Sequence, residues 1–190
     1  MRVIAGTFRS RPLKSLKGMA LRPTSDRLRE TLFNVLGERV VGSRFIDAFA
    51  GTGAVGIEAI SRGAKGVLFL ENHAPAAALI RKNLELLGVH SGVRVLPMDV
   101  LRGLEQLAAE YSSTNMSFDI VFLDPPYAAA QDYQRVLHFL GSAAFLTVGS
   151  LVIAEHRRTF EVPELIGNLE RVRVLRQGDA SLSFYRFVRR

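Results

Sequence analysis

Short apolar runs alternate with segments of helical periodicity through the middle of the chain. The apolar runs have strand length and end at polar residues, so they predict buried strands over 44–50, 66–70, 93–96, 118–124 and 151–154. Between them, apolar residues recur every three or four positions, which predicts helices that begin near 25, 54 and 75 or span 100–111 and 133–140. Strands that alternate with helices are typical of a doubly wound α/β sheet.

The two ends of the chain follow a different pattern. Arg2 to Phe8 and Arg11 to Leu16 predict two short strands, hence an N-terminal β-hairpin ahead of the first helix. That helix can be capped by any of three adjacent residues, Thr24, Ser25 or Asp26. Near the C-terminus, two strands between Leu169 and Val188 flank a Gln177-Gly178-Asp179 turn, a hairpin signal that adds an antiparallel strand to the sheet.

The length of 190 residues suits one domain, and we expect residues 1–40 to form an appendage on a 41–190 core. Cysteine is absent, which excludes disulfides, thiolate metal sites and a cysteine nucleophile, and we expect no metal site. The start lacks an apolar signal core, and no run of 18 apolar residues occurs. We therefore expect a soluble cytoplasmic protein that does not contact a membrane.

The net charge of +7 is concentrated at the two ends of the chain. Residues 1–29 hold eight Arg or Lys and one acid, and residues 156–190 hold eight basic and four acidic residues. Residues 30–155 instead carry an excess of acids. Basic ends around an acidic middle favour binding to nucleic-acid phosphates over an ordinary solvated surface.

The first helix begins with positive charge. Arg27 and Arg29 lie in its first turn, where cations oppose the helix dipole. They therefore either face an external anion or pair with Asp26 and Glu30, and the sequence leaves both interpretations open.

A glycine-rich loop follows the first buried strand. Gly51-Thr-Gly53-Ala-Val-Gly56 has GxGxxG spacing between a strand and a helix, and Glu71 stands twenty residues after Gly51. Glycines allow a tight turn and the close approach of a ligand to the helix N-terminus, and the acid can hold a ribose diol. The motif alone fits NAD and S-adenosylmethionine equally well.

Acids at three strand ends favour S-adenosylmethionine. Asp47 lies four residues before Gly51, where it can reach the ammonium of an amino acid, a group that NAD lacks. Met98 and Asp99 follow the third strand and can frame an adenine, although Asp99 fits equally well as a helix N-cap. Asp124-Pro-Pro-Tyr127 follows the fourth strand, and hydride transfer has no evident use for it.

The tetrapeptide Asp124-Pro125-Pro126-Tyr127 fits the activation of an exocyclic amine on a planar base. Such a nitrogen is a poor nucleophile until hydrogen-bond acceptors hold its protons. Asp124 offers a carboxylate, and the prolines leave the backbone carbonyls of Asp124 and Pro125 free to accept. Tyr127 offers an aromatic face to the base. The alternative is that the two prolines only end a strand.

Residues 22–36, 47–63 and 124–127 give the chain a family resemblance. It resembles the class I S-adenosylmethionine-dependent methyltransferases, and more closely the bacterial RsmD-type 16S ribosomal RNA guanine-N2 methyltransferases. The resemblance implies one methyltransferase domain over 1–190, with a Rossmann-like, mostly parallel seven-stranded sheet, one antiparallel strand, and the N-terminal hairpin and helix. It implies methylation of a guanine N2 amine in 16S rRNA, within the small subunit or an assembly intermediate, with S-adenosyl-L-homocysteine as product. We expect the enzyme to be a monomer.

The motifs and the resemblance together give a set of expected site residues. Cofactor contacts are expected from Asp47, Phe49, Ala50, Gly51, Thr52, Gly53, Glu71, Asn72, Met98, Asp99 and Asp124. The target guanine would be held by the catalytic residues Asp124, Pro125, Pro126 and Tyr127. RNA contacts are expected from Arg9, Arg11, Lys14, Lys17, Arg22, Thr24 and Arg27. Of these, Arg22, Thr24 and Arg27 can lie instead at the methionine end of the cofactor.

Other functions stay open at this point. The target amine can be adenine N6 or a protein glutamine, because similar tetrapeptides serve both. Outside methyl transfer, the alternatives are an NAD-dependent oxidoreductase and a non-catalytic RNA-binding protein. His156, near the end of the fifth strand, is either a packing residue or a catalytic one.

Overall fold

The computed structural model describes residues 1–15, 25–125 and 130–189. The chain divides into two compact units, Met1–Asp99 and Val100–Arg190. The single domain expected over 1–190 remains a prediction.

The first unit contains three parallel strands, β1 (Arg44–Ala48), β2 (Gly66–Leu70) and β3 (Val93–Leu96). Ala48 pairs with Leu70, and Leu70 pairs with Leu96, so the three strands end in one row. The residues that follow these strands therefore leave the sheet at the same edge, which is where ligands bind in open α/β sheets.

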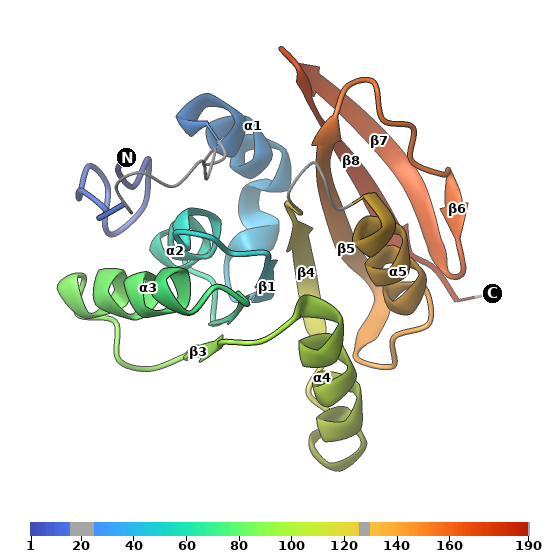
Figure 1. Ribbon diagram of the computed structural model, residues 1–190, viewed down its shortest axis with the longest axis horizontal. Coiled ribbons are helices and arrows are strands. Elements are labelled where there is room, and N and C mark those ends of the chain that lie inside the picture. The colour runs from blue at the N-terminus through green and yellow to red at the C-terminus, as the bar shows by residue number, and fades with distance from the viewer. Residues whose placement is uncertain (16–24, 126–129, 190) are drawn as a thin grey trace. The chain divides into compact units, whose positions relative to one another are not determined.

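The helices of the first unit form where the apolar periodicity predicts them, and Figure 1 shows their order along the chain: α1 (Asp26–Leu36), the 3-10 turn η1 (Gly37–Val40), α2 (Ala54–Ser61) and α3 (Ala74–Leu86). Of the three capping candidates for α1, the structure uses Ser25, whose hydroxyl accepts from Leu28 N at 3.1 Å. The apolar side of α1 is buried through Leu28, Leu32 and Phe33.

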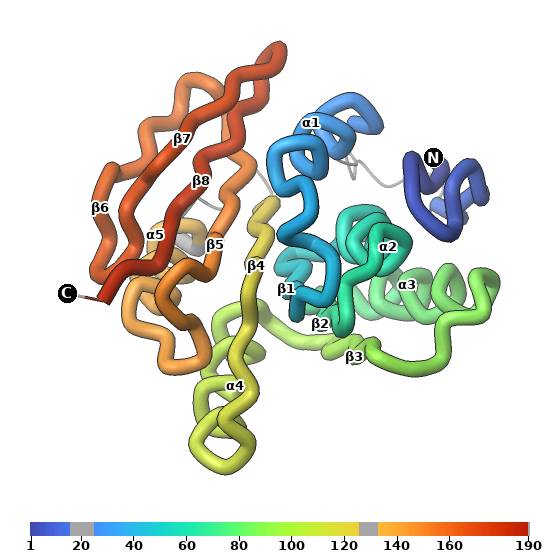
Figure 2. Tube along the Cα trace, turned by 180° about the vertical axis from the view of Figure 1, so that it is seen from behind, coloured from blue at the N-terminus to red at the C-terminus, as the bar shows by residue number. Residues whose placement is uncertain are grey.

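Residues 1–15 differ from the two regular strands expected there. Only one isolated β-bridge forms, between Arg2 and Pro12, and the residues between them make turns. Figures 1 and 2 show this segment beside α2 and α3. Val3 N and Leu13 N still bond across the segment to the carbonyls of Arg11 and Met1, at 3.0 and 3.1 Å. The ladder goes no further because the N–H groups of Ile4, Ala5 and Phe8 donate to side chains of α2 instead.

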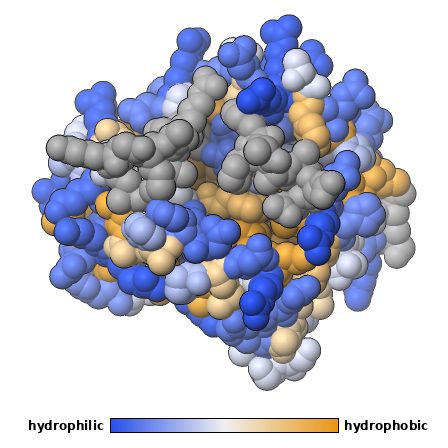
Figure 3. Space-filling view, viewed as in Figure 1, coloured by the Kyte–Doolittle hydropathy of each residue, from blue (hydrophilic) through white to orange (hydrophobic). Residues whose placement is uncertain are grey.

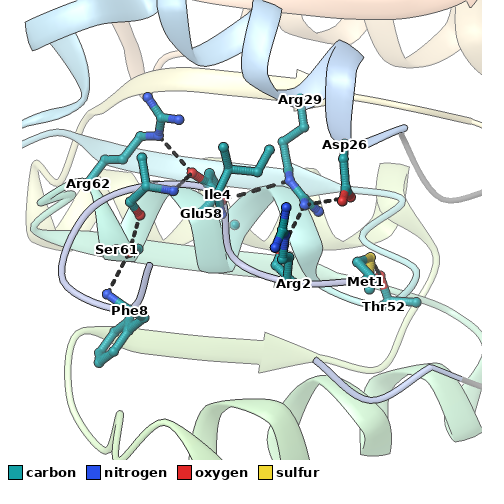
Figure 4. Close-up of polar contacts among 12 residues, drawn as sticks. Met1, Arg2, Ile4, Phe8, Asp26, Arg29, Thr52, Glu58, Ser61 and Arg62 are labelled. Atoms are coloured by element: carbon teal, nitrogen blue, oxygen red, sulfur yellow. Dashed lines mark hydrogen bonds and ion pairs between the residues drawn. The ribbon is translucent and has the colours of Figure 1, made fainter. Parts of the chain in front are cut away.

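Glu58 and Ser61 are the residues of α2 that hold the segment (Figure 4). Ile4 N and Ala5 N donate to the two carboxylate oxygens of Glu58 at 2.8 and 2.9 Å. Phe8 N donates to Ser61 Oγ at 2.9 Å. Glu58 has no exposed surface, so its carboxylate is held by these donors and by the neighbouring arginines alone.

Arg29 decides between the two interpretations of the basic first turn. Its side chain is fully buried, and its Nη2 donates to Asp26 Oδ1 at 3.0 Å and to the carbonyl of Arg2 at 2.6 Å (Figure 4). Its Nε lies 3.8 Å from Glu58 Oε2. Arg29 is therefore an internal ion-pair residue and does not face an external anion, whereas Arg27 is exposed.

The second unit contains the helices α4 (Val100–Thr114) and α5 (Ala130–Leu140). Its strands pair in the order β4-β5-β8-β7-β6, and their bounds are β4 (Phe118–Leu123), β5 (Leu146–Arg157), β6 (Leu165–Ile166), β7 (Leu169–Gln177) and β8 (Ala180–Phe187). β4 and β5 are parallel, and β8 is antiparallel to β5 and to β7 (Figure 2). The C-terminal hairpin is confirmed, β5 begins five residues earlier than expected, and the two-residue β6 was not foreseen.

The surface drawn in Figure 3 is mostly hydrophilic. Among the described residues, no helix has the length and apolar character needed to cross a bilayer. In the same ranges, no three His, Cys, Asp or Glu side chains come together as a candidate metal site.

The burial of Glu58 generates a prediction about stability. Glu58→Ala leaves Ile4 N and Ala5 N without acceptors and the buried Arg29 without its carboxylate partner on α2. We expect the free energy of unfolding to fall by about 3 to 5 kcal/mol, measured by urea denaturation. The matched control is Glu85→Ala, at an exposed position of α3, which should change it by less than about 0.5 kcal/mol. Equal stabilities of the two variants would contradict the prediction.

Candidate functional site

The loop between β1 and α2 has an unusual backbone. Phe49, Gly51 and Gly53 all have positive φ, at 63°, 54° and 77°. Glycine adopts this conformation easily, but a phenylalanine does so only at a cost of about 1 to 3 kcal/mol. Strain of this kind persists where the surrounding structure enforces it, and it concentrates at ligand sites.

Two buried carboxylates hold the loop in shape. Asp47, which is 2% exposed, accepts from Gly56 N at 2.8 Å. Glu71 accepts from Gly51 N at 2.7 Å through one oxygen and from His73 N at 2.8 Å through the other. Each carboxylate oxygen has two lone pairs, so both acids can accept further hydrogen bonds from a ligand.

Gly56, the third glycine of the motif, is required by packing. A Cβ at this position would lie 2.3 Å from Cε1 of Phe69, in the middle of β2. The absence of a side chain lets α2 pack closely on the sheet, so the motif has a structural cause that does not depend on which cofactor binds.

The other expected cofactor residues lie along the same edge of the first unit. Ala50 and Thr52 are buried, while Asn72 is exposed directly after Glu71. Met98 is half-buried and Asp99 is exposed, and Asp99 immediately precedes α4, the N-cap position that the sequence left open. The first unit thus groups the expected cofactor residues that precede Val100.

The Asp124 corner, which is Asp124 and Pro125 at the end of β4, belongs to the second unit. Asp124 is half-buried at the end of β4 and is followed by the buried Pro125. Leu123 pairs with Ala154 of β5, so Asp124 and Glu155 follow the same row of the sheet. Glu155 could not be singled out from the sequence, because an acid at the end of a predicted strand normally marks a return to solvent.

Tyr133 of α5 is a further residue that sequence reasoning missed. Its ring is buried, with ring centres 5.6 Å from Phe160 and 6.5 Å from His156. Its hydroxyl has no hydrogen-bond partner within the described ranges. Burial raises the pKa of Tyr133 well above its ordinary value, and Tyr185, Asp124 and Glu155 raise it further. The phenol therefore stays protonated as a potential donor. Its place in an apolar helical stripe made it resemble an ordinary core residue.

His156 is a packing residue in this structure. Its Nδ1 lies 2.8 Å from the carbonyl of Arg157, which can only accept, so Nδ1 carries the proton. Its Nε2 then accepts from the Ser183 hydroxyl at 2.9 Å. Both ring nitrogens are thus used inside the sheet.

The expected RNA-binding residues within the described ranges are all exposed, namely Arg9, Arg11, Lys14 and Arg27. Others of the expected site residues lie outside those ranges, namely Lys17, Arg22, Thr24, Pro126 and Tyr127.

One protein family matches nearly the whole chain. The model of the family described as "Conserved hypothetical protein 95" matches residues 1–186. The chain belongs to this family. The resemblance to RsmD-type methyltransferases inferred from the sequence motifs is confirmed, because proteins similar to this chain are named as small-subunit rRNA methyltransferases.

Three similar proteins illustrate the relationship. The chain is 34% identical to "Putative rRNA methyltransferase YlbH" of Bacillus subtilis, over 98% of both chains. It is 43% identical to "Ribosomal RNA small subunit methyltransferase D" of Haemophilus influenzae, over 67% of this chain and 64% of that one. The solved structure of "Putative methyltransferase yhhF" from Escherichia coli aligns with a TM-score of 0.83 at 28% identity, over 98% of this chain and 97% of that one. The expected α/β methyltransferase fold is confirmed.

The environment of His156 predicts how stability depends on pH. Burial lowers the pKa of His156 below that of a free imidazole. In the unfolded chain the ring takes up a proton as the pH falls through about 6.5, whereas in the folded protein it stays neutral to lower pH. The unfolded state therefore binds more protons in this interval, and the free energy of unfolding decreases as the pH falls.

We expect His156→Gln to weaken this decrease between about pH 7.5 and pH 5.5, measured by denaturant unfolding at each pH. His90→Gln, at an exposed position, is the control and should keep the wild-type dependence. An unaltered dependence in the His156 variant would refute the assignment.

Proposed function

We propose that the protein transfers a methyl group from S-adenosylmethionine to the exocyclic N2 amine of a guanine in 16S ribosomal RNA. The observation that carries the proposal is Asp124, half-buried at the end of β4 and followed by a proline, in a chain whose relatives are named as rRNA methyltransferases.

The residues of the first unit fit the methyl donor. S-adenosylmethionine carries an ammonium, a ribose diol and an adenine, and supplies an electrophilic methyl group on a sulfonium. Asp47 offers a carboxylate to the ammonium, Glu71 offers one to the diol, and Met98 with Asp99 flanks the adenine. Gly51 and Gly53 adopt a left-handed backbone without steric cost, and the lack of side chains there allows a ligand to approach the backbone closely. NAD would leave Asp47 without a matching cation.

The second unit supplies the acceptors for the target amine. The Asp124 carboxylate and the Pro125 carbonyl accept the two amine protons, which tilts the nitrogen lone pair out of conjugation and toward the methyl group. The role of the protein is then alignment of the reacting atoms rather than proton abstraction. Loss of the amine proton can follow methyl transfer, so no histidine or lysine base is needed. Pro126 and Tyr127 complete this site in the proposal, with Tyr127 stacked on the base.

Basic residues ahead of the core would bring the RNA to the site. Arg9, Arg11 and Lys14 are exposed on a segment fixed to α2 and α3. The shape of the small subunit or of an assembly intermediate would provide specificity. The monomeric state and cytoplasmic location expected from the sequence belong to this proposal as predictions.

Asp124→Asn tests the proposed chemistry. The amide keeps the size of the side chain but replaces one acceptor oxygen with a donor, which opposes the amine protons. We expect turnover to fall by about 100-fold or more while the dissociation constant for S-adenosylhomocysteine changes less than about twofold. Turnover is measured as N2-methylguanosine released by nuclease digestion of small subunits from cells lacking the protein, by mass spectrometry.

Three measurements discriminate the alternatives: mass spectrometry of the nucleosides, mass spectrometry of peptides for methylglutamine, and calorimetry with NAD and S-adenosylhomocysteine. Methylated adenine or glutamine in place of N2-methylguanosine would show that the target amine is not guanine N2. A protein that binds NAD but does not bind S-adenosylhomocysteine would overturn the methyltransferase assignment. Full turnover by Asp124→Asn would remove Asp124 from the chemistry. Naked 16S rRNA assayed beside small subunits shows which of the two is the substrate.

The RNA-binding role of the N-terminal segment predicts a salt effect. Arg9→Gln combined with Arg11→Gln removes two cations. The plot of log affinity for 16S rRNA against log salt should therefore become less steep, with the magnitude of its slope smaller by about 1.5. A control pair, Arg39→Gln with Lys65→Gln, removes the same charge from exposed positions elsewhere in the first unit. If both pairs lower the slope equally, the effect comes from net charge and the segment has no specific role.

A further inference from the structure

Asn83 of α3 joins two segments that are far apart in the sequence. Its side chain is fully buried. Its Oδ1 accepts from Lys14 N at 2.9 Å, and its Nδ2 donates to the carbonyls of Lys14 at 3.2 Å and Thr52 at 3.3 Å. One amide therefore holds the backbone of the basic N-terminal segment and the backbone of the glycine loop together.

The three bonds depend on one another. An amide has one acceptor oxygen and two N–H donors, and here the oxygen and the amino group both serve Lys14 while the amino group also serves Thr52. If residue 14 moves away, the amide loses two of its three hydrogen bonds. The orientation of the group that holds Thr52 then becomes free to change.

Thr52 lies in the part of the glycine loop where the backbone is left-handed on both sides. It stands between Gly51 and Gly53, which both have positive φ, and its own side chain is buried. Its hydroxyl also lies 3.8 Å from the sulfur of Met1, a second contact with the N-terminal segment. The remaining anchors of the segment, Glu58 and Ser61, hold Ile4, Ala5 and Phe8 and have no bond to Thr52 among the described contacts.

We propose that Asn83 couples the two binding events, so that the cofactor in the glycine loop and RNA on the N-terminal segment each strengthen the binding of the other. This inference rests on the proposed function. A ligand that orders the glycine loop fixes the Thr52 carbonyl, which fixes the amide and thereby residue 14, so part of the ordering cost of the second ligand has already been met. Coupling of this kind is reciprocal by thermodynamic necessity.

Two substitutions of Lys14 test the hydrogen bonds between residue 14 and Asn83, and the Lys14 side chain itself is exposed. Lys14→Ala removes the ammonium but keeps the backbone N–H and carbonyl that bind Asn83. Lys14→Pro removes the ammonium and also the N–H that donates to Asn83 Oδ1. The two variants should lose equal electrostatic attraction for RNA, so any difference between them reports on the hydrogen bond rather than on charge.

The experiment measures the dissociation constant of 16S rRNA with and without saturating S-adenosylhomocysteine, and that of S-adenosylhomocysteine with and without the RNA. The ratio of the two constants in each pair is the coupling factor. For wild type we expect a coupling factor of about two- to tenfold, the worth of one hydrogen bond, with the same value from both directions. Lys14→Ala should keep this factor despite weaker RNA binding. Lys14→Pro should lower it, because only the bond from Asn83 Nδ2 to the carbonyl of residue 14 remains.

Asn83→Asp provides a second line of evidence. The added oxygen faces the carbonyls of Lys14 and Thr52 in place of the amino group, so the bridge is repelled while the size of the side chain is kept. We expect this variant to bring the coupling factor close to one, below the value for Lys14→Pro, because both bonds from the amino group are lost.

The outcomes separate the inference from the proposed function. Two normal affinities with a coupling factor of one in wild type would overturn the inference alone, as would an undiminished factor in Lys14→Pro. Failure of wild type to bind S-adenosylhomocysteine would overturn the proposed function, and the inference with it.

Discussion

A fully buried carboxylate is tolerated only where several donors surround it, and Glu58 meets this condition by drawing three parts of the first unit together. It accepts from two backbone N–H groups of the N-terminal segment and pairs with Arg62 on its own helix at 2.8 Å and with Arg29 on α1 at 3.8 Å. Burial lowers the pKa of Arg29, and the neighbouring Glu58 and Asp26 oppose this shift. Because Glu58 accepts from Ile4 N and Ala5 N, and Arg29 donates to the carbonyl of Arg2, residues 1–15 are an integral part of the unit.

The same helix connects this ion pair to the candidate cofactor loop. α2 begins at the glycine loop and ends at Ser61. Its C-terminal half holds the N-terminal segment, while Gly56 in its first turn donates to the Asp47 carboxylate. Three buried side chains, Asp47, Glu71 and Asn83, then bind backbone groups of the loop or of α2. A loop held from several sides can sustain the strained backbone of Phe49, which an isolated turn would relax.

The sequence predicted those features whose cause is local. Periods of two and 3.6 residues located β2, β3 and the C-terminal hairpin, and glycine and proline spacing located the loop and the Asp124 corner. It did not predict the form of residues 1–15, because Ile4, Ala5 and Phe8 bond to side chains 53 or 54 positions away. Glu58 and Asn83 were missed for the same reason. A polar residue in an apolar helix normally faces water, and only the tertiary structure supplies the partners that allow it to be buried.

The arrangement of ionisable groups in the second unit bears on what kind of catalysis it can support. General acid–base catalysis needs a group with a pKa near the working pH and a free nitrogen or oxygen to move the proton. His156 does not fit this requirement, because both of its ring nitrogens bond within the sheet and burial favours its neutral form. Tyr133 does not fit it either, because burial keeps its phenol protonated. Among the described residues of the unit, the Asp124 carboxylate is an acceptor and the protonated Tyr133 hydroxyl is a potential donor. Groups of this kind suit a reaction whose electrophile is already activated and whose nucleophile needs only to be oriented.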